Sequence, residues 1–332
     1  MTRSDRLSID PAFRGCILIT QRGETLFSYA SGDADLANER PNTLDTKFPT
    51  ASAGKVFVAA AILQLLEQGR LQGTDTLGQL LAFPLHCIDP AITIRQLLTH
   101  TSGIPDYFDE SVMEDYSELF KDIPNYSIRS SKDLLPLFWD KPMSYVPGER
   151  FQYNNAGYVM LGLVIEAITR MPFDAFLAEA VFRPAGMCDT GYYELDRLPK
   201  NCANAYLFDE ATDEFYTNIY SVDAKGTGAG GAFTTVADIS RFWNALFDGT
   251  LLRPDTATHM ITPQVAARTS QYGYGVWLHK DTRLPYIQGS DPGVSFFSSY
   301  DPAASLCIVL VSNYADHVWK LHRGLLEQLG KR

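Results

Sequence analysis

The chain has 332 residues, of which 45% are hydrophobic and 20% are charged, a composition typical of a globular protein and not of a disordered one. Its formal net charge of −11 argues against nucleic acids and anionic membranes as partners. We find neither a run of 18 apolar residues nor the apolar core of a secretory signal near the N-terminus, so we expect no membrane span and a cytoplasmic location.

The residue types that bind metals are scattered along the chain. The five cysteines never form a CxxC pair, and the six histidines form no HExxH or HxH motif. We therefore expect no metal site and no disulfide framework, and we interpret the cysteines as free thiols of a reducing compartment.

The first part of the chain contains a predicted hairpin and a predicted buried helix. Residues 15–20 and 25–30 are rich in β-forming residues and flank a turn at 21–24, which predicts two paired strands. Residues 55–71 begin with positions that are apolar almost all round, as in a fully buried helix, and Gly69 is a typical helix end.

Residues 75–225 differ in character, because short helical patterns alternate there with loops rich in proline and aromatic residues. Few segments of this part have the pattern of a strand. The predicted helices lie at residues 93–98, 132–138, 156–168 and 173–181.

Strand-like segments return after residue 233. A predicted helix at 235–247 comes first, and a closing helix is predicted at 316–329. The predicted strands between them lie at residues 272–279, 285–288, 293–300 and 305–312. Because strands occupy both ends of the chain, we predict an α/β (α+β) domain from residues 1–74 and 226–332, with a helical domain inserted at 75–225.

An S-x-x-K pattern, Ser52-Ala53-Gly54-Lys55, stands at the predicted start of the buried helix. Residues at i and i+3 share a helix face, so the Ser52 hydroxyl and the Lys55 amine would lie side by side. Apolar neighbours would favour a neutral Lys55 that accepts the serine proton, and the helix N-terminus would favour an oxyanion. The alternative is that Ser52 is a plain helix cap.

Two glycine patterns that suggest nucleotide binding fail on inspection. A phosphate loop ending at Gly54-Lys55 would need glycine at position 49 and serine or threonine at 56, where the chain has Pro49 and Val56. Residues 226–231 fit G-x-G-x-x-G, but no buried strand precedes them. We therefore expect no nucleotide cofactor.

A second polar pattern, Tyr153-Asn154-Asn155, comes just before the predicted helix at 156–168. A Tyr153 hydroxyl beside Ser52 could pass a proton to a leaving group if cations lower its pKa, and the Asn155 amide could hold Lys55 or a substrate carbonyl. The alternative is a buried tyrosine followed by a capping asparagine.

Further motifs follow in a fixed order: the S-x-x-K helix at 48–71, ITIRQLLTHTSGIP at 92–105, PGERFQYNNAGYVMLGLV at 147–164, and GGAFTTVADISRF with YGYGVW at 230–242 and 272–277. In these stretches the sequence resembles the serine hydrolases related to class C β-lactamases and low-molecular-weight penicillin-binding DD-peptidases, which include β-lactamase-related esterases. The resemblance implies a β-lactamase/transpeptidase-like fold. Such a fold has an antiparallel sheet flanked by helices, a mostly helical domain, and an active site in the cleft between them.

The resemblance also implies roles for individual residues. Ser52 would be the acylated nucleophile, Lys55 and Tyr153 the acid–base pair, and Asn155 a polar contact. The backbone N–H groups of Ser52 and Ser290 would form the oxyanion hole. Either a neutral Lys55 or a Tyr153 phenolate would be the base.

The third family motif, usually Lys-Thr-Gly or His-x-Gly, falls at Ile287-Gln288-Gly289 when it is counted back from Asp291-Pro292-Gly293. Gly289 fits this motif, and we expect it and Gln288 near the substrate. Ile287 has no charge where the family has lysine or histidine, so we expect weak activity on β-lactams. Lys280, Arg283 and the Gln288 amide are the nearby substitutes.

Two further residues come from the 92–108 region. The resemblance makes His100 structural rather than a catalytic base. Tyr107 lies in the loop after Gly103, where it either lines the substrate cleft or packs into the core.

We therefore expect a serine hydrolase that cleaves an ester, amide or β-lactam bond of a small molecule or peptide through a Ser52 acyl-enzyme, without a metal or organic cofactor. The alternative is a penicillin-binding or peptide-recognising protein on the same scaffold, with little or no turnover. Ile287 is the feature that favours this alternative. The sequence predicts neither the natural substrate nor the oligomeric state.

Overall fold

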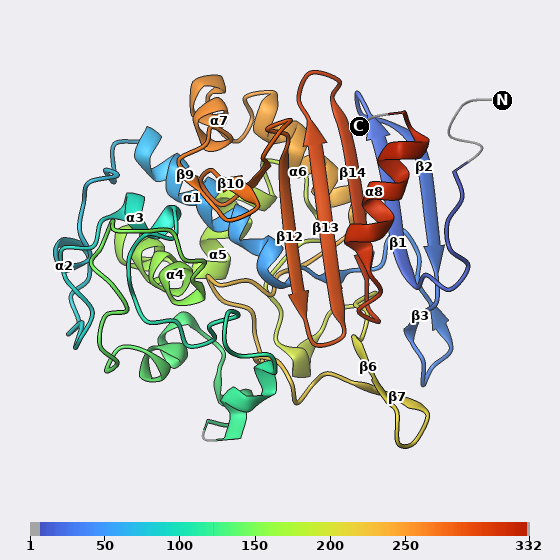
Figure 1. The fold of residues 1–332 in the computed structure, drawn as a ribbon, viewed down its shortest axis with the longest axis horizontal. Helices are drawn as coiled ribbons and strands as arrows, with labels where there is room; N and C mark the ends of the chain where they lie inside the picture. The colour runs from blue at the N-terminus through green and yellow to red at the C-terminus, as the bar shows by residue number, and fades with distance from the viewer. Residues whose placement is uncertain (1–6, 122, 331–332) are drawn as a thin grey trace.

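The computed structural model describes residues 7–121 and 123–330 and is built around one eight-stranded sheet (Figure 1). Its neighbouring strands pair antiparallel, in the order β2-β1-β14-β13-β12-β11-β10-β9. The strands are β1 (Gly15–Gln21), β2 (Glu24–Ser31), β9 (Val265–Ala266), β10 (Ser270–Tyr272), β11 (Trp277–His279), β12 (Pro285–Asp291), β13 (Val294–Asp301) and β14 (Leu306–Ser312). Both ends of the chain therefore build the sheet, as the sequence predicts.

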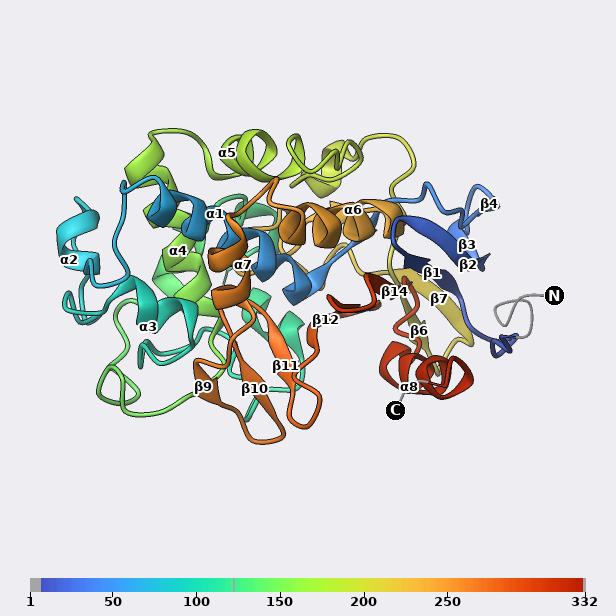
Figure 2. The same cartoon turned by 90° about the horizontal axis from the view of Figure 1, so that it is seen from above.

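The central strands are apolar on both faces because helices cover both faces of the sheet. Successive side chains of a strand point to opposite sides. In β1, Ile17 and Ile19 pack with α8 (Val318–Gln328), whereas Cys16 and Leu18 face the main core. Helix α6 (Val236–Phe247) lies on that second face, and Figure 2 shows α6 and α8 on opposite sides of the sheet.

Helix α1 (Lys55–Glu67) runs through the centre of the molecule, and its first nine residues are all buried. The Phe57 ring meets Phe182 and Phe242 edge-on, each at 5.1 Å between centroids, which fixes α1 against its neighbours. A 3-10 turn over Ala51–Gly54 precedes α1, so Ser52 lies in this turn and not in the α-helix itself.

The middle of the chain is mainly helical, with short strand pairs at its margins. Its helices are α2 (Leu77–Leu80), α3 (Ile94–Leu98), α4 (Asn155–Thr169) and α5 (Phe173–Leu177), with a π-helical turn at Ala178–Phe182 and 3-10 helices at Tyr116–Lys121, Asn125–Ser127, Ser131–Leu137 and Leu195–Arg197. The remaining elements are α7 (Pro254–Met260) and the pairs β3 (Asp33–Asp35) with β4 (Arg40–Pro41), β5 (Phe48–Pro49) with β8 (Phe233–Thr234), and β6 (Tyr206–Asp209) with β7 (Glu214–Thr217). The division into two domains at residues 75 and 225 stays a prediction.

Two local predictions need correction, and one hairpin was missed. The segment predicted as a helix at 132–138 is a 3-10 helix, since Pro136 lacks the backbone N–H that an α-helix needs. The segment predicted as one strand at 272–279 is two strands, β10 and β11, joined by a turn in which Gly275 has a φ of +73°. The β6–β7 hairpin was not predicted.

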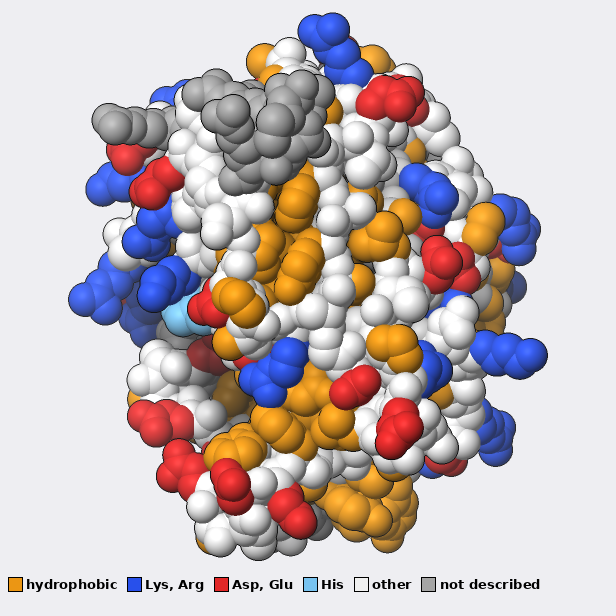
Figure 3. Space-filling view, turned by 90° about the vertical axis from the view of Figure 1, so that its right-hand side faces the viewer, with side chains coloured by type: hydrophobic (Ala, Val, Ile, Leu, Met, Phe, Trp, Pro, Cys, Tyr) orange, Lys and Arg blue, Asp and Glu red, His pale blue; other side chains and the backbone are white. Residues whose placement is uncertain are grey.

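The β6–β7 hairpin carries apolar side chains at the surface. Phe208, Phe215 and Tyr216 are exposed by 48%, 36% and 51%, and the Arg14 guanidinium stacks over the Phe215 ring at 4.9 Å. Figure 3 shows hydrophobic side chains exposed in the middle and in the lower half of this face of the molecule. Among the helices that the structure describes, none has the length and apolar character to cross a bilayer.

Candidate active site

A cavity of about 710 Å³ opens beside the N-terminus of α1. The turn that carries Ser52 forms part of its wall, together with the loop at 107–117, the segment at 221–233 and the end of β12 with the following turn. The cavity is therefore lined both by the sheet and by the helical part of the chain.

Ser52 is held in an unusual backbone turn at the wall of this cavity. The preceding residue, Ala51, has a φ of +47°, a conformation that costs energy for a residue with a side chain. Ser52 is half-buried, and its Oγ lies 2.9 Å from Lys55 Nζ. The predicted neighbours at i and i+3 are therefore in hydrogen-bond contact.

The Lys55 amine has two fixed acceptors besides the serine. Nζ donates to Asn155 Oδ1 at 2.8 Å and to the Ala229 carbonyl at 2.5 Å, and the side chain is 2% exposed. Burial lowers the pKa of Lys55 to about 8, although the charges of Glu110 and other nearby carboxylates oppose this shift. A neutral amine has two N–H bonds and one lone pair, so donation to the two carbonyl oxygens directs the lone pair toward Ser52.

Tyr153 lies next to this pair with its ring 5.0 Å from Lys55 Nζ. Burial, with Glu110 adding to it, raises the pKa of Tyr153 well above its usual value, although a hydrogen bond with Ser52 opposes the rise. The hydroxyl therefore keeps its proton, and of the two bases that the sequence left open, the structure favours neutral Lys55.

His100 packs against the ring of Tyr153 and does not contact Ser52. Its Nδ1 accepts the backbone N–H of Asn154 at 3.1 Å, so the ring proton is on Nε2, which faces Tyr272 Oη at 3.1 Å. Burial lowers the pKa of His100 well below its usual value. The imidazole ring lies 4.5 Å from the Tyr153 ring and stays neutral.

Asp106 orients Asn155, and the sequence analysis did not identify it. Its carboxylate accepts the backbone N–H groups of Asn155 and Ala156 at 2.8 and 3.0 Å and contacts Asn155 Nδ2 at 3.2 Å. A carboxylate only accepts, so it turns the amide nitrogen toward itself and leaves Oδ1 for Lys55. Burial raises the pKa of Asp106 to about 7, although these donors oppose the rise. Its position directly after the ITIRQLLTHTSGIP stretch was the available signal.

Strand β12 passes close to the serine turn, as the oxyanion-hole prediction requires. A side chain at Gly289 would place its Cβ 2.7 Å from the Ser52 nitrogen, so only glycine fits there. Ser290, the next residue, is exposed and lines the cavity. Tyr107 is 3% exposed, and its ring both lines the cavity and packs near Phe138.

The other residues of the third motif do not reach the cavity. Gln288 points to the opposite face of β12, where its Oε1 accepts Trp319 Nε1 at 2.8 Å, so the expectation that its amide meets substrate does not fit this geometry. Ile287 is 2% exposed and packs in the main core. Lys280 and Arg283 are exposed and do not line the cavity, so neither replaces the missing charge.

Within the described residues, no group of three or more histidine, cysteine, aspartate or glutamate side chains is arranged to hold a metal ion. Cys16, Cys87, Cys188, Cys202 and Cys307 are all free thiols.

The fold and the serine–lysine pair define a known class of protein. The profile of the Beta-lactamase family matches residues 11–326, and the chain belongs to this family. Its β-lactamase/transpeptidase-like fold and its resemblance to penicillin-binding serine hydrolases, both predicted from the sequence, are thereby confirmed.

Particular relatives show how near the match is. The crystal structure of a penicillin-binding protein from Bacillus halodurans is 37% identical, with a TM-score of 0.90 over 94% of this chain and 96% of that one. A penicillin-binding protein of Bacillus subtilis (strain 168) is 28% identical over 302 residues; the match covers 85% of this chain and 64% of that protein's length. The D-amino acid amidase from Ochrobactrum anthropi SV3 shares the fold, with 24% identity and a TM-score of 0.78 over 96% of this chain and 94% of that one.

Proposed function

We propose that the protein is a serine hydrolase that cleaves ester or amide bonds through an acyl-enzyme on Ser52. The observation that carries this proposal is the environment of Lys55. Nζ donates to two carbonyl oxygens, burial lowers the pKa of the amine to about 8, and Nζ lies 2.9 Å from Ser52 Oγ. In its neutral form the amine can accept the serine proton across this contact. A plain helix cap would need none of these features.

In the proposed reaction, Lys55 takes the Ser52 proton while Oγ attacks the substrate carbonyl carbon. The backbone N–H groups of Ser52 and Ser290 stabilise the resulting oxyanion, because β12 and the serine turn lie against each other at Gly289. Tyr153, which keeps its proton, donates it to the leaving group and regains one from the Lys55 ammonium. Water then hydrolyses the acyl-enzyme by the reverse route, and the substrate is a small molecule or peptide.

β-Lactams are expected to be poor substrates, because the apolar Ile287 gives their carboxylate no charge to bind. The second candidate function, a penicillin-binding type of protein with little turnover, rests on the same residue. The cytoplasmic location stays a prediction.

The test is active-serine labelling followed by a substrate panel. We expect a fluorophosphonate probe to give a single mass adduct on Ser52, and nitrophenyl esters to be cleaved faster than nitrocefin. Labelling without turnover of any ester or amide would favour the penicillin-binding alternative, and no adduct on Ser52 would refute the proposal.

The pH dependence follows from Lys55. Because the neutral amine is the active form, kcat/KM for a neutral ester should rise about tenfold per pH unit below pH 8 and reach a plateau above about pH 9. The measurement is a pH series with nitrophenyl butyrate. A rate that still climbs beyond about pH 10, the ordinary value for both lysine and tyrosine, would contradict a lowered lysine pKa.

A further inference from the structure

We propose that the substrate carries a free, positively charged amino group near the scissile bond, and that Asp291, Asp223 and Glu110 bind this group. The inference rests on the proposed function, because the cavity beside Ser52 is then where substrate lies. It adds a substrate class to the reaction: amides, esters or short peptides of amino acids whose amino group is unblocked.

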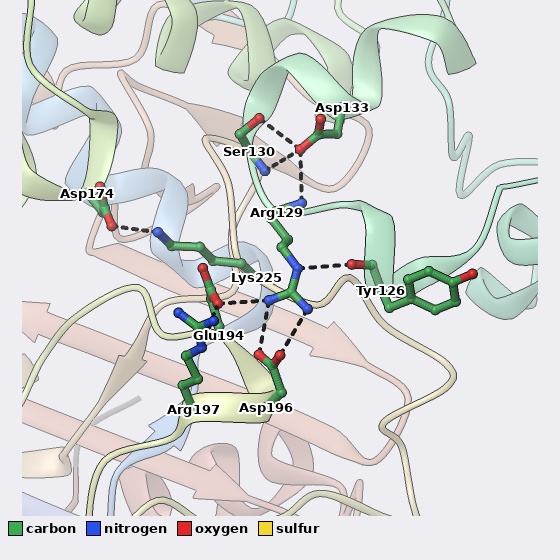
Figure 4. Close-up of polar contacts among 9 residues, drawn as sticks. All are labelled: Tyr126, Arg129, Ser130, Asp133, Asp174, Glu194, Asp196, Arg197 and Lys225. Atoms are coloured by element: carbon green, nitrogen blue, oxygen red, sulfur yellow. Dashed lines mark hydrogen bonds and ion pairs between the residues drawn. The ribbon is translucent and has the colours of Figure 1, made fainter.

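The charge of the cavity wall is the first observation. Five carboxylates line the cavity, those of Glu110, Glu114, Asp115, Asp223 and Asp291. Among the described lining residues, Lys225 is the only cation, and its Nζ binds Asp174 Oδ2 at 2.6 Å (Figure 4). The charge of Lys225 is therefore already paired, and the lining of the cavity has an excess of negative charge.

The second observation is where these carboxylates lie relative to the reacting groups. Asp291 directly follows Ser290, the proposed second donor of the oxyanion hole. Asp291 and Glu110 both lie near enough to Lys55 to raise its pKa. A substrate whose carbonyl reaches Ser52 would therefore lie in the same cavity as the Asp291 carboxylate, on the side of the proposed oxyanion hole.

The third observation is that no lysine, arginine or histidine of the described residues forms an ion pair with these carboxylates. Among the ion pairs within residues 7–121 and 123–330, none includes Glu110, Asp223 or Asp291. Burial and the Asp291 charge raise the pKa of Asp223 to about 7, although the Tyr116 hydrogen bond opposes the rise. Burial and the Glu110 charge raise the pKa of Asp291 to about 7, although the nearby Lys55 opposes the rise. Tyr116 Oη holds Asp223 in place, 3.3 Å from each carboxylate oxygen. An ammonium group would supply the charge that both carboxylates lack.

Two other occupants fit less well. The described residues contain no metal-binding arrangement of three such side chains, so the carboxylates do not converge on one ion. An anionic substrate would be repelled by the five carboxylates that line the cavity. The aromatic rings of Tyr107, Phe108 and Tyr116 border the same cavity and provide an apolar surface for the side chain of an amino acid.

The test compares substrates that differ only in the charge of the amino group. Phenylalanine p-nitroanilide and its N-acetyl derivative, each as D and L enantiomers, are assayed at pH 7. We expect the free amine to be preferred at least tenfold in kcat/KM. Asp291→Asn and Asp223→Asn should each remove most of this preference, mainly through KM, as for loss of a charge-assisted hydrogen bond.

Glu118→Gln is the matched control, because Glu118 lies on the neighbouring 3-10 helix, pairs with Lys121 and does not line the cavity. It removes one negative charge and should leave the preference unchanged. Equal rates on the free and acetylated substrates, or equal losses on both in the aspartate variants, would overturn the inference. If the protein still cleaves nitrophenyl butyrate and still forms the fluorophosphonate adduct on Ser52, the proposed function stands although this inference fails. If the protein neither cleaves this ester nor forms the adduct, the hydrolase proposal itself fails.

Thermal unfolding gives a readout that does not depend on turnover. A carboxyl whose pKa is raised from 3.8 to about 7 on folding contributes stability that is present at low pH and lost as pH rises through this range. Asp291→Asn should therefore raise the unfolding midpoint by about 2 °C or more at pH 8 and have little effect at pH 4. A lower midpoint at pH 8 would mean that the carboxylate is already compensated within the protein, which contradicts the inference.

Discussion

Ser52→Ala is expected to lower kcat on a nitrophenyl ester by about 10³-fold or more, because Ser52 carries the hydroxyl that Lys55 Nζ contacts. The fold should be unaffected, since Ser52 is half-buried and the Oγ contact with Lys55 is one of three that Lys55 makes. The measurements are the steady-state rate, the thermal unfolding midpoint, and the intact mass after fluorophosphonate treatment, which should show no adduct.

The control for this variant is Ser290→Ala, which removes a cavity-lining hydroxyl but keeps the backbone N–H proposed for the oxyanion hole. Ser290→Ala should stay within a few-fold of the unmodified protein and should still be labelled. Retention of most activity by Ser52→Ala would remove Ser52 from the mechanism.

Lys55→Gln should lower kcat/KM on a neutral ester by about 10³-fold, nearly as much as Ser52→Ala but for a different reason. The glutamine amide can still donate to the Asn155 and Ala229 oxygens, so these buried acceptors keep a partner, but an amide has no lone pair basic enough to take the serine proton. The residual activity should also lose its rise toward pH 8. Both quantities come from a pH series of kcat/KM on a neutral ester.

Lys47→Gln is the matched control, because Lys47 is also buried but pairs with Asp189 and does not line the cavity. It should leave the pH profile unchanged. A Lys55→Gln variant with normal rate and normal pH profile would show that another group is the base, and Tyr153 would then be the next to test.

The sequence predicted the large elements because their patterns follow directly from their environment. Helix α1 is buried on all sides, so its apolar positions cannot be mistaken for those of a loop. The β6–β7 hairpin was missed because most of its residues are exposed, and its strands therefore lack the apolar alternation that marks a strand. The split between β10 and β11 depends on Gly275, where the chain turns next to α1.

The site was only partly predictable for a similar reason. The Ser52–Lys55 contact spans three residues, so spacing alone is enough to predict it. Asp223 and Asp291 are far apart in the sequence and meet only in the folded cavity, so no local pattern marks them. Gln288 could have been placed better, because side chains alternate along a strand and Gly289 must face the serine turn.

The sheet is built from both ends of the chain, so it can form fully only after nearly the whole chain has been synthesised. Cys16 of β1 lies opposite Val311 of β14, which is 295 positions later in the chain (311 − 16), and Ser8 hydrogen-bonds to the side chain of Gln328. During synthesis the β1–β2 hairpin emerges first, whereas β14, the second neighbour of β1, is the last strand to be made. Strand β1, which lies between β2 and β14 in the finished sheet, therefore has an open edge in the nascent chain until residues 306–312 leave the ribosome.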